Sequence, residues 1–115
     1  MAPAVLIVED DRDIAAVFTE LLISEGYDVV AVYDGQQALE VIFSHAIDLV
    51  VSDIRMPRLN GLSLIHEVRA SGSAVPFILI STIDTEYRTR DLTNVEFLRK
   101  PVEINELIGA VKTML

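Results

Sequence analysis

The sequence predicts an α/β domain in which helices pack on both faces of a five-stranded parallel sheet. Short apolar runs alternate along the chain with segments whose apolar residues recur every three or four positions, which is the pattern of strands alternating with helices. The runs are continuously apolar, as expected of strands buried on both faces. Regular alternation of strand and helix implies right-handed crossovers and parallel strands.

The strands are expected at five apolar runs, namely AVLIV (4–8), DVVAV (28–32), LVVS (49–52), FILIS (77–81) and VEFLR (95–99). Between and after them, apolar periodicity predicts helices. The first should end at Gly26, a typical C-terminal cap, and Asp34 and Gly35 should start the second. Pro57 and Gly61 bracket the loop before the third. The apolar residues of these helices and of the last one are Ile14, Val17, Phe18, Leu21 and Leu22; Ala38, Leu39 and Ile42; Leu62, Ile65 and Val68; and Ile104, Leu107, Ile108, Val111 and Leu115.

The composition is that of a single globular domain over residues 1–115. The chain is 51% hydrophobic, which is enough to build a core and unlike a disordered chain. It has no cysteine, so neither disulfides nor thiolate metal sites are available. Its net charge of −9 argues against direct binding of nucleic acid or of an anionic membrane. The sequence shows no signal peptide and no run near the roughly 18 apolar residues that cross a bilayer, so we expect a cytoplasmic protein.

Polar residues stand at the carboxyl ends of four predicted strands, the edge where doubly wound sheets bind ligands. They are three acids after the first strand, an aspartate after the third, a hydroxyl ending the fourth and a lysine after the fifth: Glu9, Asp10, Asp11, Asp53, Ser81 and Lys100. Crowded carboxylates raise one another's pKa and resist ionisation. The sequence therefore indicates a site in which other charges compensate these acids.

Carboxylates without thiols or imidazoles favour a hard cation, and Mg²⁺ is typically held by one or two carboxylates and a phosphate oxygen. Asp53, which precedes an irregular loop, could attack a phosphoryl group and form an acyl phosphate. Lys100 and the Ser81 hydroxyl could contact the phosphoryl oxygens. Taken singly, each residue also fits a simpler role, as a helix cap, a turn former or a surface residue. Their joint placement at the strand ends favours a site.

Four stretches together resemble the receiver domain of bacterial two-component response regulators. They are VEDD (8–11), SDIRMPRLNG (52–61), the serine that ends the fourth strand, and LRKP (98–101), and the resemblance extends from about Val5 to Leu115. It implies the flavodoxin-like (CheY-like) fold, a three-layer α/β/α arrangement with strand order 2-1-3-4-5.

The resemblance also implies roles for individual residues. Asp53 would accept a phosphoryl group from a histidine kinase or a histidine phosphotransfer protein. Mg²⁺ would be bound by Asp53, directly by Asp10, largely through water by Glu9, and by the main-chain carbonyl of Arg55. Further implied features are a helix start at Asp11, a cis Lys100–Pro101 peptide, and a switch in which phosphorylated Asp53 draws Ser81 towards it and Phe97 turns inward. Ordinary strand packing of Phe97 remains an alternative.

Three features depart from the family pattern. The segment between Ser81 and Lys100 is short, and LTN (92–94) replaces the usual Gly-Ala lead into the fifth strand, so the fourth helix should be short or irregular. Thr82 stands where Ala or Gly is usual, and its bulk should restrict water and prolong the life of the phosphoryl group. Arg55 could reach over the phosphoryl group or contact a partner.

The implied function is a phosphoacceptor that switches protein contacts. The domain would act alone on a downstream effector or through an attached output domain, with a phosphorylation-dependent dimer as one outcome. It would catalyse only its own phosphorylation and dephosphorylation, so it would not be an enzyme in the usual sense. One alternative is a receiver-like interaction domain that works without phosphorylation. Another is a flavin- or nucleotide-binding module, although the acidic EDDRD segment (9–13) repels phosphate unless a cation intervenes.

Overall fold

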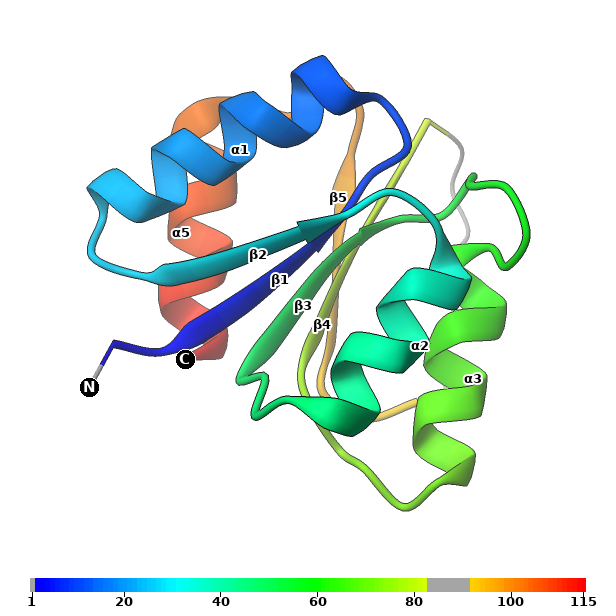
Figure 1. Cartoon of the computed structure of the whole chain (residues 1–115). Helices are drawn as coiled ribbons and strands as arrows, with labels where there is room; N and C mark the ends of the chain where they lie inside the picture. Colours follow the sequence, from blue (N-terminus) through cyan, green and yellow to red (C-terminus); the bar gives the residue numbers. More distant parts are fainter. Residues whose placement is uncertain (1, 83–91) are drawn as a thin grey trace.

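The computed structural model describes residues 2–82 and 92–115. The elements follow the predicted alternation (Figure 1), and they are β1 (Ala4–Val8), α1 (Arg12–Ser24), β2 (Asp28–Val32), α2 (Gly35–Ser44), β3 (Leu49–Asp53), α3 (Gly61–Ala70), β4 (Phe77–Ser81), β5 (Val95–Arg99) and α5 (Ile104–Met114). All five predicted strands are present, and β3 extends one residue further than expected, so that it includes Asp53. The predicted short fourth helix falls largely on residues 83–91, which lie outside the described residues.

The five strands form one parallel sheet in the order β2-β1-β3-β4-β5, as predicted. Helices α1 and α5 cover one face of the sheet, and α2 and α3 cover the other (Figure 1). The helices and the sheet therefore form three layers. The chain adds β2 on one side of β1 and then β3, β4 and β5 on the other, so the direction of winding reverses between β1 and β3. The carboxyl ends of these two strands therefore meet at the position where such sheets bind ligands.

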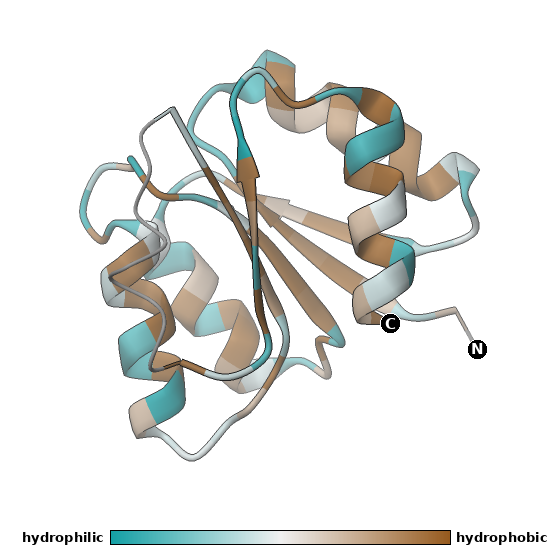
Figure 2. Ribbon diagram, turned by 180° about the vertical axis from the view of Figure 1, so that it is seen from behind, coloured by the Kyte–Doolittle hydropathy of each residue, from teal (hydrophilic) through white to brown (hydrophobic). Residues whose placement is uncertain are grey.

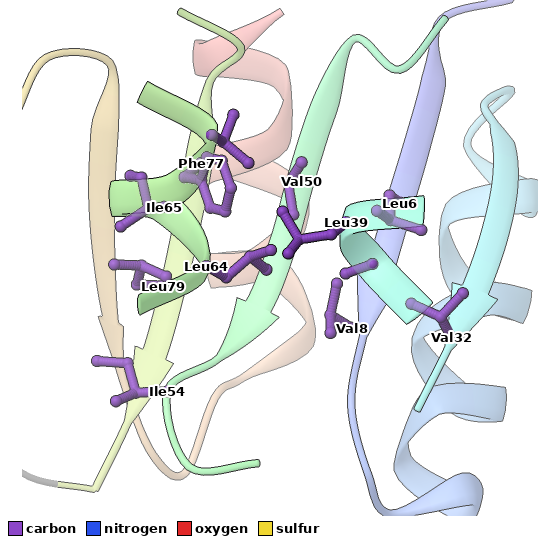
Figure 3. Close-up of a cluster of buried hydrophobic side chains, with 12 residues drawn as sticks. Leu6, Val8, Val32, Leu39, Val50, Ile54, Leu64, Ile65, Phe77 and Leu79 are labelled. Atoms are coloured by element: carbon purple, nitrogen blue, oxygen red, sulfur yellow. The ribbon is translucent and has the colours of Figure 1, made fainter. Parts of the chain in front are cut away.

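Successive residues of the inner strands enter opposite faces of the sheet, because side chains alternate along a strand. In β1, Leu6 and Val8 join the cluster under α2 and α3, whereas Val5 and Ile7 join the cluster under α1 and α5. Figure 3 shows the first of these clusters, where side chains of β1, β3 and β4 meet those of α2 and α3. Hydrophobic residues run along the strands (Figure 2), and β3 and β4 are buried throughout.

The outer strands and two helices differ from the prediction in their burial. Strands β2 and β5 are only partly buried, because each has a neighbour on one side alone. In α1, Ile14 and Val17 are 37% and 55% exposed, although both belong to the predicted apolar stripe. They border an open depression beside the β5–α5 connection. In α5, Ile104 is likewise exposed at 56%.

Side chains fix the helix starts as the sequence suggested. Asp11 caps α1 by accepting the backbone N–H groups of Asp13 and Ile14. Asp34 caps α2 through the N–H of Gln37 at 2.8 Å. Such caps satisfy donors that the first turn of a helix leaves unpaired. The predicted start of α2 at Asp34 and Gly35 is therefore confirmed.

Asn94 ends the LTN segment that leads into β5. Asn94 has a φ of +56°, a left-handed conformation that asparagine tolerates better than most residues. Its side-chain amide donates to the carbonyl of Ala74 at 3.0 Å. Arg69 of α3 donates to the carbonyl of Thr93 at 2.9 Å. These contacts attach the start of β5 to the end of α3 and set the strand's position beside β4.

Candidate functional site

Three carboxylates meet at the carboxyl end of the sheet. Glu9 and Asp10 directly follow β1, and Asp53 is the last residue of β3. Each offers one oxygen within 4.8 Å of the oxygens of the other two. Glu9 and Asp53 are only 4% and 5% exposed, whereas Asp10 is exposed. The structure thus brings together the acids that follow the first and third strands, while Asp11 serves as the helix cap.

Lys100 adds one positive charge to this group. Its Nζ lies 2.7 Å from Oδ2 of Asp53, and its backbone N–H donates to the carbonyl of Ser81 at 2.9 Å. The peptide between Lys100 and Pro101 is cis, as the resemblance implied. Partial burial of the ammonium group opposes its charge, but the hydrogen bond to Asp53 and the surrounding carboxylates outweigh burial, so the pKa of Lys100 is raised.

Burial is the main reason that the pKa of Glu9 rises from 4.5 to about 7. The backbone N–H of Asp11, which donates to Oε2 of Glu9 at 3.1 Å, opposes this rise. A hydrogen bond with the carboxyl group of Asp10 and the negative charge of Asp53 reinforce it, and the charge of Lys100 lowers it. The net effect is that the Glu9 carboxyl group takes up a proton more readily than an exposed glutamate does.

The donor set fits a hard divalent cation. When every group is ionised, the three carboxylates and one ammonium group leave a local charge of −2, which a divalent cation would balance. Carboxylate oxygens are the ligands that Mg²⁺ prefers in proteins. The negative charge of Asp53 contributes to the raised pKa of Glu9, after burial as the main cause. Among the described residues, this group is the one cluster of acids with metal-ligand spacing.

The remaining predicted residues surround this cluster. Ser81 is buried at the end of β4, one residue beyond the Asp53–Ile80 pairing of β3 with β4. Thr82 is exposed and lines the same depression as Lys100. Phe97 is half-buried in β5 and packs against the cluster under α2 and α3. Arg55 is exposed. The switch assigned to Ser81 and Phe97 stays a prediction.

The loop between β3 and α3 closes back on Asp53. The N–H of Ile54 donates to the carbonyl of Ile80 at 2.9 Å, and the N–H of Gly61 donates to the carbonyl of Ile54 at 2.8 Å. A Cβ atom on Gly61 would lie 2.5 Å from the carbonyl oxygen of Asp53, so glycine is required for this approach. The first and last residues of the loop are therefore fixed against each other.

An open depression of about 560 Å³ adjoins the acidic cluster. Polar groups at one end give way to apolar side chains of α1 and of the β5–α5 connection; its lining is Glu9, Asp13, Ile14, Val17, Phe18, Ile80, Thr82, Lys100, Pro101 and Val102. Sequence reasoning placed Ile14 and Val17 on an apolar helix stripe and did not foresee this surface. Helical periodicity alone does not tell a buried stripe from one that lines a depression.

Sequence reasoning also missed an ion pair beside the site. Nε of Arg58 lies 2.8 Å from Oδ2 of Asp34. The carboxyl group of Asp34 is 3% exposed and the Arg58 side chain 69%. Hydrogen bonding from the N–H of Gln37 and the pairing with Arg58 outweigh burial and lower the pKa of Asp34. The two residues are 24 positions apart, and no local pattern relates them.

The fold and the site define a receiver domain, the phosphoacceptor module of two-component systems. The family model for the response regulator receiver domain matches residues 5–112, so the chain belongs to this family. Receiver domains of response regulators interact with histidine kinases and with effector domains.

The chain is 34% identical over 110 residues to the transcriptional regulatory protein DltR of Streptococcus agalactiae; this covers 93% of the chain and 49% of DltR. It is 32% identical over 113 residues to the response regulator ArlR of Staphylococcus aureus, which covers 96% of the chain and 52% of ArlR. The chain thus spans about half the length of the curated relatives it matches.

Solved structures agree with the fold. The receiver domain of Francisella response regulator 1452 superposes with a TM-score of 0.88 at 31% identity, over 97% of this chain and 95% of the other. The response regulator TrrA of Thermotoga maritima, solved in complex with Mg²⁺ and BeF, gives 0.87 at 29% identity, over 98% and 99%. Among the described residues, no helix combines the length and apolarity that spanning a membrane requires.

Proposed function

We propose that Asp53 of this receiver domain accepts a phosphoryl group from the phosphohistidine of a histidine kinase or a histidine phosphotransfer protein. The observation that carries the proposal is the environment of Asp53. This buried carboxylate ends β3, lies 2.7 Å from the ammonium group of Lys100, and has two further carboxylates within 4.8 Å. A buried nucleophile with one cation and a cluster of acids beside it is suited to phosphoryl transfer, which depends mainly on positioning and charge neutralisation.

In the proposed reaction, a carboxylate oxygen of Asp53 forms a bond to phosphorus as the bond from phosphorus to the histidine nitrogen breaks. The electron pair of that bond stays on the departing imidazole, and the product is an acyl phosphate. Lys100 holds Oδ2 of Asp53 and orients the carboxylate, and its ammonium group offsets charge on the phosphoryl oxygens. The Ser81 hydroxyl, at the end of the adjacent strand β4, would donate to one of those oxygens.

Mg²⁺ is the cation we propose for the acidic cluster, with Asp10 and Asp53 as direct ligands, Glu9 acting largely through water, and the main-chain carbonyl of Arg55 as a further ligand. When bound, it would neutralise the oxygens of the transferred group and of these carboxylates. The local charge of −2 left by three carboxylates and one ammonium group supports this assignment. TrrA, at 29% identity, was solved with Mg²⁺ and BeF.

The depression beside α1 supports docking of a histidine-bearing helix. Ile14, Val17 and Phe18 present apolar surface along α1, and the depression runs without a break to Glu9 and Lys100. An amphipathic helix that covers Val17, which is 55% exposed, would bury apolar area and bring its histidine to the acidic cluster. The donor would thereby be held close to Asp53.

Phosphorylation would then bias contacts with a downstream effector or an attached output domain, through Ser81 and Phe97. Phe97 packs against the cluster under α2 and α3 and is partly exposed. This placement would allow its side chain to turn either inward or outward. A phosphorylation-dependent dimer remains a prediction, as does a cytoplasmic location. We also propose that the domain turns over no separate substrate and is not an enzyme in the usual sense.

The decisive experiment is incubation of the full chain with Mg²⁺ and a phosphorylated histidine phosphotransfer protein, or with acetyl phosphate, followed by intact-protein mass spectrometry. We expect the mass to increase by one phosphoryl group. EDTA added beforehand should prevent this increase, and Asp53→Asn should not show it. Asp48→Asn, which changes an exposed aspartate that accepts the N–H of Ala4, is the matched control and should be phosphorylated normally. A chain that is never phosphorylated would instead favour the phosphorylation-independent interaction domain.

A further inference from the structure

The loop between β3 and α3 contains a strained turn centred on Arg58. The N–H of Leu59 donates to the carbonyl of Pro57 at 2.7 Å, which closes a three-residue γ-turn around Arg58. The φ of Arg58 is +66°, in the left-handed region that residues with a Cβ atom rarely adopt. A non-glycine residue keeps such a conformation only where its surroundings hold it.

Asp34 is the group that holds this turn. Its Oδ2 accepts Nε of Arg58 at 2.8 Å, and its Oδ1 accepts the N–H of Gln37 at 2.8 Å. Asp34 is 2% exposed, so its carboxylate is fixed in place by α2 before Arg58 reaches it. Most surface ion pairs contribute little, because both partners must be ordered. In this pair the aspartate is already ordered, so only the arginine side chain loses conformational freedom when the two residues pair.

A second contact ties the same turn to α2. A Cβ atom on Gly35 would lie 2.0 Å from the carbonyl oxygen of Leu59, so the backbone of the turn rests directly on the backbone of the first residue of α2. The other end of the loop is closed at Gly61 against Asp53. The loop from Asp53 to Gly61 is therefore held at its base and at its tip.

We propose that the Arg58–Asp34 ion pair is a positioning device for the phosphoacceptor site, which holds the strained turn against α2 and thereby sets the loop that begins at Asp53 and carries Arg55. The inference rests on the proposed function, because this loop supplies the Asp53 carboxylate and the Arg55 carbonyl to the cation. Arg58 is a positioning residue, since it acts through the backbone of this loop.

Positioning and simple electrostatics predict opposite signs for Arg58→Ala. Loss of this cation takes the net charge from −9 to −10, and charge alone would strengthen the binding of Mg²⁺. Loss of positioning would weaken it, because the oxygens of the site would no longer be preset. We expect Mg²⁺ affinity to fall about three- to tenfold, at the lower end of what groups supporting metal ligands contribute.

The experiment is isothermal titration calorimetry of Mg²⁺ into the full chain. The matched control is Lys112→Ala, which also removes one cation from an ion pair, with Glu25 at 3.1 Å, but in the last turn of α5, whose C-terminal end lies near the start of β1 (Figure 1). Its Mg²⁺ affinity should equal that of the wild type or rise slightly. Arg58→Lys, which restores the charge without the planar guanidinium group, should recover part of the affinity.

Arg58→Gly separates positioning from stability. Glycine adopts a positive φ without strain, so this variant should unfold at a denaturant concentration equal to or above that of Arg58→Ala. Its Mg²⁺ affinity should nevertheless be as weak, since the ion pair is still missing. If stability and Mg²⁺ binding recover together, the role of Arg58 is only structural and the inference is wrong.

Asp34→Asn completes a double-mutant cycle, because asparagine keeps the cap on the N–H of Gln37 and removes the charge. Combined with Arg58→Ala, it should weaken Mg²⁺ binding no further than Arg58→Ala alone. Additive effects, or wild-type affinity in Arg58→Ala, overturn the inference while the proposed function stands. A wild-type chain that neither binds Mg²⁺ nor is phosphorylated overturns both.

Discussion

The pKa of Glu9 makes a quantitative prediction about stability without Mg²⁺. Burial and the neighbouring carboxyl groups raise this pKa from 4.5 to about 7. The folded state therefore binds a proton on Glu9 more tightly than the unfolded state does. The resulting stabilisation is fully present below pH 4.5 and is lost as the pH rises through 7. In EDTA, the free energy of unfolding should therefore fall between pH 5 and pH 8 relative to a chain that lacks this group.

The magnitude follows from the linkage relation. One pKa unit corresponds to about 1.36 kcal/mol, so the rise from 4.5 to about 7 sets an upper value of about 3 kcal/mol. Glu9 lines the open depression, where water screens part of this effect, so we expect a loss of about 1–3 kcal/mol. Glu9→Gln keeps an oxygen for the N–H of Asp11 and can donate to Asp10, but it cannot ionise.

The assay is urea unfolding, followed by circular dichroism, of the wild type and Glu9→Gln at pH 5, 6, 7 and 8 in EDTA. The variant should gain stability relative to the wild type steadily across this range. Glu40→Gln, which changes an exposed glutamate on α2, is the matched control and should show a constant difference. Equal pH dependence of the wild type and Glu9→Gln would show that Glu9 does not hold the proton assigned to it.

Three further predictions follow from the geometry of the site. Because a proton on Glu9 competes with the cation, Mg²⁺ affinity measured by calorimetry should fall about tenfold from pH 8 to pH 6. An affinity that does not change with pH would contradict the raised pKa of Glu9. Lys100→Met leaves the carboxylates uncompensated and should lower the free energy of unfolding at pH 8 in EDTA by about 1–2 kcal/mol. This value is reduced for solvent screening, because the Lys100 side chain is 32% exposed. Added Mg²⁺ should restore most of the lost stability, and an unchanged denaturation midpoint in the variant would contradict this prediction. Thr82→Ala should shorten the life of a radiolabelled phosphoryl group, because Thr82 lines the depression that adjoins the site and its bulk should restrict water there. Unchanged or slower loss would refute that role.

Much of the site could be predicted from sequence because parallel strands share one carboxyl edge. Acids at the ends of the first and third strands must lie close together once these strands are neighbours, and the sheet order makes them so. The same reasoning brings Lys100 to Asp53, since β5 pairs with β4 and β4 with β3. A strand fixes the direction and the end point of its chain to within about a residue, so the residues that follow it are placed well.

The parts that sequence reasoning missed depend on contacts between loops. The Arg58–Asp34 pair joins two loops that no strand register relates, and Gly35 shows its role only because a Cβ atom there would collide with the carbonyl oxygen of Leu59. The raised pKa of Glu9 depends on burial, which a run of acids in a sequence does not reveal. Local patterns give the charges of a site, and the packing of loops decides how those charges are compensated.

Helix α1, which borders the depression, shows that hydrophobic periodicity alone does not tell which apolar residues are buried. The apolar stripe of α1 was predicted from its spacing alone, and its residues divide between two environments. Leu22 is fully buried near the end of the helix, whereas Val17 is 55% exposed beside the acidic cluster. An apolar side chain left exposed next to a charged site has a solvation cost that packing within this domain does not offset. A partner that covers Val17 would remove this cost close to Asp53, as the docking of a phosphoryl donor proposed above would require.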